Sequence, residues 1–225
     1  MCVTRETKVV NERKNAAVKY NLKYRNYKKE DKKELLRLLR EKRKYVDFFE
    51  DEKYAEKYTK MALSEFLGTC TYKKVAVAGE KIIGAVIGMK KDRTPILLKL
   101  KRKLCCLHLK IKRKNREALR CFSMIEDMEE DLIKSGHVSQ KNLLALFLID
   151  KKYGKTEIWQ NLLEEWEKKI DESPEKVIYA FACSKSEQQF LEEHSFQVVD
   201  EKVIMIQPRD CRYRFRKTLL KKRKV

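Results

Sequence analysis

The sequence predicts a mixed α/β fold, in which a partly parallel sheet is flanked by helices and interrupted by a helical insertion. Two runs rich in Val and Ile, within residues 74–89, flank a Gly-Glu pair and predict a β-hairpin. A continuous apolar run at 143–149 is typical of a central strand that is buried on both faces. The last third alternates apolar runs with amphipathic ones, and such short crossovers place neighbouring strands parallel.

Length and composition indicate one large domain. The chain has 225 residues, 43% of them hydrophobic, which is enough to bury a sizeable core. With only 6 Gly and 3 Pro, collagen-like and linker-dominated architectures are excluded. We expect an N-terminal arm at 1–21, a single domain at 22–220 that includes an insertion at 91–140, and a basic tail at 221–225.

The chain starts with charged residues and contains no apolar run of the roughly 20 residues that span a bilayer, so we expect neither a signal peptide nor a membrane span. The seven cysteines are odd in number and form no C-x-x-C pair, and the adjacent Cys105 and Cys106 suit zinc poorly. We therefore expect free thiols, no metal and a cytoplasmic location.

The charge balance favours an anionic partner. There are 54 Lys plus Arg against 34 Asp plus Glu, a formal net charge of +20. Nucleic acid, an acidic protein, a nucleotide or an anionic membrane surface are all compatible with this excess, which is spread along the chain.

The first third predicts a strand, two helices and the hairpin. Residues 22–27 alternate apolar and polar side chains, as a half-buried strand does. Asp31 can cap a helix with a leucine-rich inner face, and a second helix follows and ends at Gly68. The hairpin turn is Gly79-Glu80.

Residues 91–140 contain two amphipathic helices of opposite charge. The first has leucines at helical spacing among ten Lys or Arg between Lys99 and Arg120, and the second is acidic around residues 126–131. On one interpretation they form a complementary hairpin that covers the core. On the other, the basic helix serves a membrane surface or RNA. The apolar positions of the basic helix are Leu97, Leu100, Leu104, Leu107 and Ile111.

The last third predicts strand, helix, strand, helix and strand. The strands are expected at 143–149, 177–182 and 198–206, and the short second helix at 186–194. The first helix has one apolar stripe, formed by Ile158, Leu162, Leu163, Trp166 and Ile170. At 214–219, Phe215, Lys217 and Leu219 alternate with Arg214, Arg216 and Thr218, and this two-residue period indicates a final edge strand.

This order of elements, together with three segments, resembles the GNAT acyl-CoA N-acyltransferase superfamily from about Leu22 to Gln207. GEKIIGAVIG is similar to the hairpin of that superfamily, and FLIDKKYGKTEIWQNLLEEWEKK to its cofactor-binding strand, turn and helix. FLEEHSFQVVDEKVI is similar to its closing segment, usually written F-Y-E-x-x-G-F. The resemblance implies a GNAT-like sheet and acetyl transfer from acetyl-CoA to a primary amine.

The resemblance also implies where the cofactor is bound. Backbone amides at a strand-to-helix turn can hold a diphosphate, and the positive end of the helix adds attraction. In members of the superfamily this turn has the sequence pattern Q/R-x-x-G-x-G/A, whereas in this chain the glycine positions fall on Lys155, Glu157 and Trp159. The cofactor-binding residues implied are Leu146, Phe147, Leu148, Ile149, Gly154, Lys155, Thr156, Glu157, Ile158, Trp159 and Ser184.

The groups that usually assist catalysis in the superfamily are absent at their usual positions. An amine must lose a proton before it attacks the thioester, and the departing thiolate must gain one. Where relatives carry a base or a water-holding carboxylate, this chain has residues 142–144, and the usual tyrosine is Leu191. Substitute candidates are Cys183 at the end of a strand and Tyr72 before the hairpin, with Glu192 and His194 beyond them.

Two functional hypotheses follow. One is an acetyltransferase whose partners are acetyl-CoA and an amine acceptor. The other is a catalytically degenerate module of the same fold that binds RNA, ribosome or an acidic protein through its basic surface. The missing glycines and tyrosine favour the second, whereas the intact order of elements favours the first, because backbone contacts to the cofactor tolerate changes of side chain.

Overall fold

The computed structural model describes residues 22–91, 94–153, 157–170, 176–207 and 212–223. The arm expected at 1–21 therefore lies outside the described residues. The elements are β1 Leu22–Asn26, η1 Lys29–Asp31, α1 Lys32–Arg43, η2 Tyr45–Asp47, α2 Glu52–Thr69, β2 Cys70–Ala78, β3 Lys81–Lys90, α3 Ile96–Lys110, α4 Arg113–Ser135, η3 Gln140–Asn142, β4 Leu143–Ile149, η4 Lys151–Tyr153, α5 Glu157–Ile170, β5 Val177–Ala182, α6 Lys185–Glu193, β6 Gln197–Ile206 and β7 Tyr213–Arg223.

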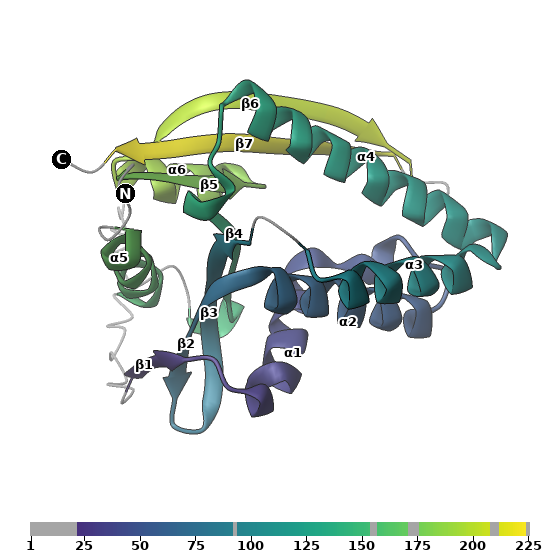
Figure 1. The fold of residues 1–225 in the computed structure, drawn as a ribbon, viewed down its shortest axis with the longest axis horizontal. Coiled ribbons are helices and arrows are strands. Elements are labelled where there is room, and N and C mark those ends of the chain that lie inside the picture. Colours follow the sequence, from purple (N-terminus) through teal and green to yellow (C-terminus); the bar gives the residue numbers. More distant parts are fainter. Residues whose placement is uncertain (1–21, 92–93, 154–156, 171–175, 208–211, 224–225) are drawn as a thin grey trace, which may run out of the picture.

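Seven strands form one sheet in the order β1-β2-β3-β4-β5-β7-β6. Neighbouring strands are antiparallel except β4 and β5, which are parallel and are connected through α5. The expected mixed, partly parallel sheet is thus confirmed. In Figure 1, β5, β6 and β7 run at a steep angle to β2, β3 and β4, so the sheet is strongly twisted between β4 and β5.

Helices cover both faces of the sheet. One core cluster joins leucines of α1 and α2 to β2, β3 and β4, and the other joins α5 and α6 to the opposite face. The five apolar residues expected to line one stripe of α5 are all buried, with Trp166 fully inaccessible to solvent. The 3.6-residue period therefore identified the inner face of this helix correctly.

The hairpin of β2 and β3 is confirmed, and its turn residue Gly79 has a φ of 62°, which glycine adopts readily. The expected stop at Gly68 is wrong, because α2 continues to Thr69. Gly68 instead permits close packing between helices. A Cβ there would lie 2.2 Å from the Leu98 Cδ1 atom of α3.

The C-terminal strand corrects two expectations. β7 is not an edge strand, because it pairs with β5 on one side and β6 on the other. The tail expected at 221–225 is also wrong for 221–223, which belong to β7, where Lys221 pairs with Tyr179 and Arg223 with Val177. Residues 224–225 lie outside the described residues. Strand order is a property of the whole sheet, and the local pattern of one strand does not reveal it.

The insertion forms the two expected helices, α3 and α4, which meet at the end of the molecule opposite α5 (Figure 1). Their charges are complementary at one point, where Arg102 of α3 forms ion pairs with Glu65 of α2 and Glu126 of α4. The leucine stripe of α3, however, is exposed to solvent and does not cover the core. Within the described part of the chain, no helix is both long and apolar enough to cross a membrane.

Candidate active site at the divergence of two parallel strands

β4 and β5 separate soon after they begin. They pair only at Leu143 with Tyr179 and at Leu144 with Ala180, although β4 continues to Ile149 and β5 to Ala182. The gap opens toward the carboxyl ends of both strands, where α5 and α6 begin. Ligands of open α/β sheets bind at such a point, because backbone groups there lack a neighbouring strand.

A bulge in β4 lies at the point of separation. The partner of Ile87 is Leu146 and that of Gly88 is Leu144, so Ala145 is an extra residue in β4. A bulge bends a strand and increases its twist. Beyond it, the Asp150 amide bonds to Ile83 of β3, so by the two-residue alternation of a strand Phe147 and Ile149 direct their backbone groups away from β3, into the gap.

Side chains bridge the gap on the α1 face. Lys42 Nζ lies 2.7 Å from the carbonyl oxygen of Phe147 and 2.8 Å from Oε1 of Glu187. The other carboxylate oxygen of Glu187 accepts the backbone N–H of Cys183, at the end of β5, at 2.8 Å. We name Lys42 and Glu187 the polar bridge. It links β4 to the end of β5 through side chains, where the two strands no longer pair with each other.

The surroundings of Glu187 in the polar bridge favour its ionised form. Burial raises the pKa of Glu187, but the nearby Lys42 ammonium, the Cys183 N–H and the Arg43 guanidinium outweigh it, so the net pKa is lowered. Glu187 is therefore ionised at neutral pH and holds the Lys42 ammonium in place.

An aromatic contact bridges the gap on the opposite face. The Trp159 ring, in the first turn of α5, packs edge-on against Phe147 of β4 at 4.8 Å and Phe190 of α6 at 4.5 Å between centroids. Glu157, in the same turn of α5, is exposed to solvent. Trp159 therefore covers the gap from the α5 side, and a ligand that enters there contacts the indole.

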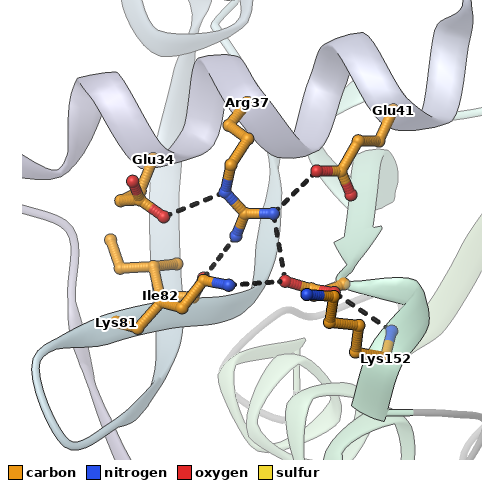
Figure 2. Close-up of polar contacts among 7 residues, drawn as sticks. Glu34, Arg37, Glu41, Lys81, Ile82 and Lys152 are labelled. Atoms are coloured by element: carbon orange, nitrogen blue, oxygen red, sulfur yellow. Dashed lines mark hydrogen bonds and ion pairs between the residues drawn. The ribbon is translucent and has the colours of Figure 1, made fainter.

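Asp150 fixes the end of β4, where the chain turns toward α5. Its buried carboxylate lies 3.0 Å from the Arg37 guanidinium of α1 and 3.3 Å from Lys81 of β3, and it accepts the Lys152 N–H at 3.0 Å (Figure 2). Burial raises the pKa of Asp150, but the Lys152 N–H and the two cations outweigh this effect. The net pKa is therefore lowered, and the carboxyl stays ionised. The start of the turn is thus anchored to both α1 and β3.

A cavity of about 390 Å³ adjoins the gap on the α1 and α2 face. Its floor includes Ala145 of β4 and Phe181 of β5, one residue from each of the diverging strands. Aromatic rings of the α1–α2 connection, α2, α4 and β7 form much of the wall, and carboxylates of α4 lie along it. This volume is within the range of small-molecule sites.

Two cationic side chains lie beside the cavity. Arg43 lines it, with its Nε atom buried and without a hydrogen-bond partner among the described residues, and its Nη1 atom lies 4.0 Å from Cys183 Sγ. Lys217 of β7 is only 2% exposed and forms an ion pair with Glu129 of α4, which also lines the cavity. Burial and the charges of Arg43 and Lys42 lower the pKa of Lys217 well below its usual range, and the Glu129 carboxylate beside it is the group that favours the charged ammonium.

The expected cofactor residues are only partly brought together. Leu146 and Leu148 point their side chains into the α1-side core, whereas Phe147 and Ile149 present backbone groups to the gap. Ile158 is buried in the core, and Ser184 caps α6 by accepting the Glu187 N–H at 3.2 Å. The turn residues Gly154, Lys155 and Thr156 lie outside the described residues.

The catalytic candidates differ in position. Cys183 is half-buried at the end of β5, next to the gap. Tyr72 lies away from the cavity, packs against Trp166 and donates its hydroxyl to the Glu165 carbonyl at 2.8 Å, and burial raises its pKa. Its surroundings support a packing role, and its catalytic role stays a prediction. Leu191, which the resemblance places at the usual tyrosine position, is 4% exposed in the core.

Sequence reasoning missed Lys42, Arg43, Glu187, Glu129 and Lys217. Each of these charged residues looks like part of a solvated helix or strand surface in a Lys-rich chain. The one local signal was the alternation around 214–219, which places Lys217 on the same side of the strand as Phe215 and Leu219. The contact between Lys42 and Phe147 spans 105 residues of sequence and depends on the tertiary fold.

Comparison with solved structures identifies the fold. Arylalkylamine N-acetyltransferase 2 from Aedes aegypti superimposes with a TM-score of 0.57 at 14% identity, over 90% of this chain and 98% of that chain. The Drosophila melanogaster polyamine N-acetyltransferase gives 0.54 at 14% identity, over 88% and 99%. An acetyltransferase of the GNAT family from Streptococcus pneumoniae gives 0.51 at 14% identity, over 89% and 98%.

No family model matches the sequence, and no curated protein matches it significantly. At these identities the structural likeness establishes the fold alone. The chain therefore has the GNAT fold, that of a group of N-acetyltransferases, and the resemblance seen in the sequence is confirmed at this level.

Proposed function

We propose that this chain is a GNAT-like N-acetyltransferase that transfers an acetyl group from acetyl-CoA to a primary amine. The observation that supports this most directly is the gap between β4 and β5, which opens after two paired residues and adjoins a cavity of about 390 Å³. Structurally similar proteins include N-acetyltransferases, among them enzymes named for arylalkylamines and polyamines.

The gap suits an extended chain that carries amide groups, which is the chemistry of the pantetheine arm. Such a chain can bond to the Phe147 and Ile149 edge of β4 as an added strand would. The diphosphate would then lie toward the N-terminus of α5. Exposed Lys151, Lys152 and Lys185 follow the carboxyl ends of β4 and β5 and would attract this anionic end.

The cavity suits an amine with an apolar or aromatic body. Tyr45, Tyr58 and Phe122 form an aromatic cluster there, with Tyr58 and Phe122 stacked at 4.4 Å. Carboxylates of α4 along the wall attract an ammonium group, whereas the half-buried Arg43 and Lys42 disfavour its charged form once it reaches the gap. The acceptor would thus be collected as a cation and would react as a neutral amine.

In the proposed reaction, the amine nitrogen attacks the thioester carbonyl, and the C–S bond breaks as the new amide forms. Glu129, on the cavity wall and held by Lys217, accepts the proton that the amine loses. The CoA thiolate leaves and takes up this proton from Glu129 through a water molecule, which restores the Glu129 carboxylate. Positioning of the two substrates supplies much of the rate.

Calorimetric titration with acetyl-CoA, together with Trp159 fluorescence, tests the proposal. We expect saturable binding at micromolar concentrations and a change in indole emission, because Trp159 borders the gap. The variant Trp159→Phe is the control. It should keep binding in the calorimeter but lose most of the emission change, because the other tryptophan, Trp166, is fully buried. Absence of binding at millimolar acetyl-CoA would contradict the proposal.

A second candidate function is a binding module of the same fold without catalysis. The buried leucine at the usual tyrosine position and the net charge of +20 favour it. It predicts no heat with acetyl-CoA and salt-sensitive retention on RNA, with a steep dependence on salt concentration. The same titration therefore separates the two candidates. A cytoplasmic location remains a prediction from the sequence.

A further inference from the structure

α3 has two apolar faces, and the fold uses only the shorter one. Leu98 and Leu109 face inward, where Leu98 contacts the backbone region of Gly68 in α2 and Leu109 joins the aromatic cluster of α2 and α4. The opposite face projects a second row of apolar side chains into solvent. Its members, which we call the α3 stripe, are Ile96, Leu97, Leu100, Leu104, Leu107 and Ile111.

The α3 stripe is continuous and strongly exposed. Its residues are between 51% and 84% exposed. Ile96 and Leu97 are adjacent, and from Leu97 to Ile111 the residues recur at intervals of three and four, so all six lie along one side of about four helical turns. A helix of this length extends roughly 22 Å. Scattered apolar side chains on a surface are ordinary, but a continuous ridge of six indicates an interaction surface.

Basic residues flank the α3 stripe on both sides, and α3 contains no acidic residue. By the 100° rotation per residue, Lys99, Lys103 and Lys110 lie along one flank and Lys101 along the other, all exposed to solvent. The cationic character continues past the end of the stripe in exposed Lys112 and Arg113. The surface thus combines an apolar ridge with positive margins.

Charge and shape together select among occupants. RNA would pair with the lysines but leave the leucines in water. A second copy would place lysine margins against lysine margins, because the stripe has the same charge in every copy. An anionic bilayer surface satisfies both features, since the ridge enters the boundary between headgroups and acyl chains and the lysines meet lipid phosphates and carboxylates.

We propose that α3 is a peripheral membrane-binding helix that lies in the plane of an anionic lipid surface and buries the α3 stripe in it. The interaction is independent of the acetyl-CoA site, which lies at the gap between β4 and β5. It requires no membrane span, and it binds the protein reversibly, through apolar burial and charge together.

Sedimentation of the full chain with lipid vesicles tests this. Vesicles of phosphatidylcholine with phosphatidylserine should bind the protein, and vesicles of phosphatidylcholine alone should bind it at least about tenfold more weakly. The double variant Leu100→Gln/Leu104→Gln should lower the partition constant at least about tenfold, since it removes two apolar side chains from the ridge. Both sites are exposed, so circular dichroism and the melting temperature should be unchanged.

Matched variants on other surfaces serve as controls. Val203→Thr/Met205→Thr removes two exposed apolar residues from β6 and should leave vesicle binding unchanged. Lys99→Gln/Lys103→Gln should weaken binding to phosphatidylserine vesicles, whereas Lys29→Gln/Lys33→Gln, on exposed lysines of η1 and α1, should not.

Three results would overturn the proposal. One is no binding to phosphatidylserine vesicles. The second is wild-type binding by Leu100→Gln/Leu104→Gln, which would mean that charge alone acts. The third, from sedimentation velocity, is a wild-type dimer that the same leucine variant dissociates, which would assign the α3 stripe to an interface between copies.

Discussion

The gap between β4 and β5 is bridged by two side-chain contacts of different chemistry. Lys42 bonds to the Phe147 carbonyl and to Glu187 on one face, and Trp159 packs between Phe147 and Phe190 on the other. An unpaired buried backbone group is costly, so a strand edge that awaits a ligand needs a substitute partner. Lys42 is that partner, and its flexible side chain can withdraw when another group bonds to Phe147.

Glu129 is the residue whose replacement should affect the chemical step most. We expect Glu129→Gln to lower kcat about 100-fold, because the amide cannot accept the proton from the amine. KM for acetyl-CoA should stay within about twofold, since the substitution lies on the acceptor side of the gap. Steady-state kinetics with an arylalkylamine or polyamine acceptor measures both.

The matched control for this prediction is Glu117→Gln, which lies earlier on α4, is exposed to solvent and does not line the cavity. It should leave kcat nearly unchanged. Equal losses in the two variants would show that α4 acts through its overall charge, and a normal kcat in Glu129→Gln would remove this carboxylate from the mechanism.

Asp150 should contribute to stability in a pH-dependent manner. Its pKa is lowered in the folded state, so its contribution is fully present above the unfolded pKa of about 4 and is lost as pH falls toward the folded value. At pH 7 we expect Asp150→Asn to lower the free energy of unfolding by about 3 kcal/mol, because it removes one partner of a buried ion pair.

Urea denaturation at a series of pH values measures this effect. The difference between wild type and Asp150→Asn should be constant above about pH 5 and should shrink below about pH 4. Glu80→Gln, in the exposed hairpin turn, is the control and should show no such difference. A difference in the free energy of unfolding that stays constant down to pH 2.5 (about 1.5 units below the ordinary carboxyl pKa) would mean that the charge of Asp150 is not the cause.

At the scale of elements, the bulge in β4 depends on close packing by β3. Gly88 lies opposite Leu144, and a Cβ on Gly88 would lie 2.4 Å from Cη2 of Trp166 and 3.0 Å from the Leu143 carbonyl oxygen. Trp166 is fully buried and cannot move freely, and the carbonyl is backbone. The glycine thus allows α5 to pack against the strand next to the point where β4 leaves β5.

We therefore expect Gly88→Ala to destabilise the protein by about 1–3 kcal/mol, as overpacking of a core does. Gly68→Ala is a useful comparison, because the nearest atom is the end of the Leu98 side chain, which can rotate. Alanine also favours the helical backbone there by about 1 kcal/mol, so the net change should be small. Thermal melts of both variants distinguish packing around β4 from a general intolerance of alanine.

The elements themselves were largely predictable from the sequence, but their use was not. The apolar run predicted the strand β4, and the apolar stripe predicted the buried face of α5. Both predictions were confirmed. In α3 the stronger apolar pattern is the exposed one, because periodicity reports a face without saying what covers it. The polar bridge and Lys217 depend on contacts between distant segments, which no local pattern contains.

At the scale of the whole molecule, β7 holds the second half of the sheet together. It is the only strand in the described part of the chain that pairs with either β5 or β6 by antiparallel hydrogen bonds, and its Lys222 forms a 2.7 Å ion pair with Glu167 of α5. The last strand in the chain therefore joins β5 and β6, the two other strands beyond the gap.

Removal of residues 221–225 should accordingly lower the free energy of unfolding by about 2–4 kcal/mol, since strand pairs at three positions are lost, each with a net hydrogen-bond value of about 1 kcal/mol. Removal of 224–225 alone should have no measurable effect. Thermal and urea unfolding compare the two truncations. Equal stability of both would mean that residues 221–223 do not pair in solution as the structure shows.

Hydrogen exchange of individual backbone amides, followed with and without acetyl-CoA, tests the central claim most directly. The amides of Phe147 and Ile149 face the gap, whereas those of Leu146 and Leu148 already face β3. Saturating acetyl-CoA should slow exchange at Phe147 and Ile149 and leave Leu146 and Leu148 as they are. Unchanged exchange at all four amides, or protection that occurs only elsewhere in the chain, would contradict the assignment of this gap to the cofactor.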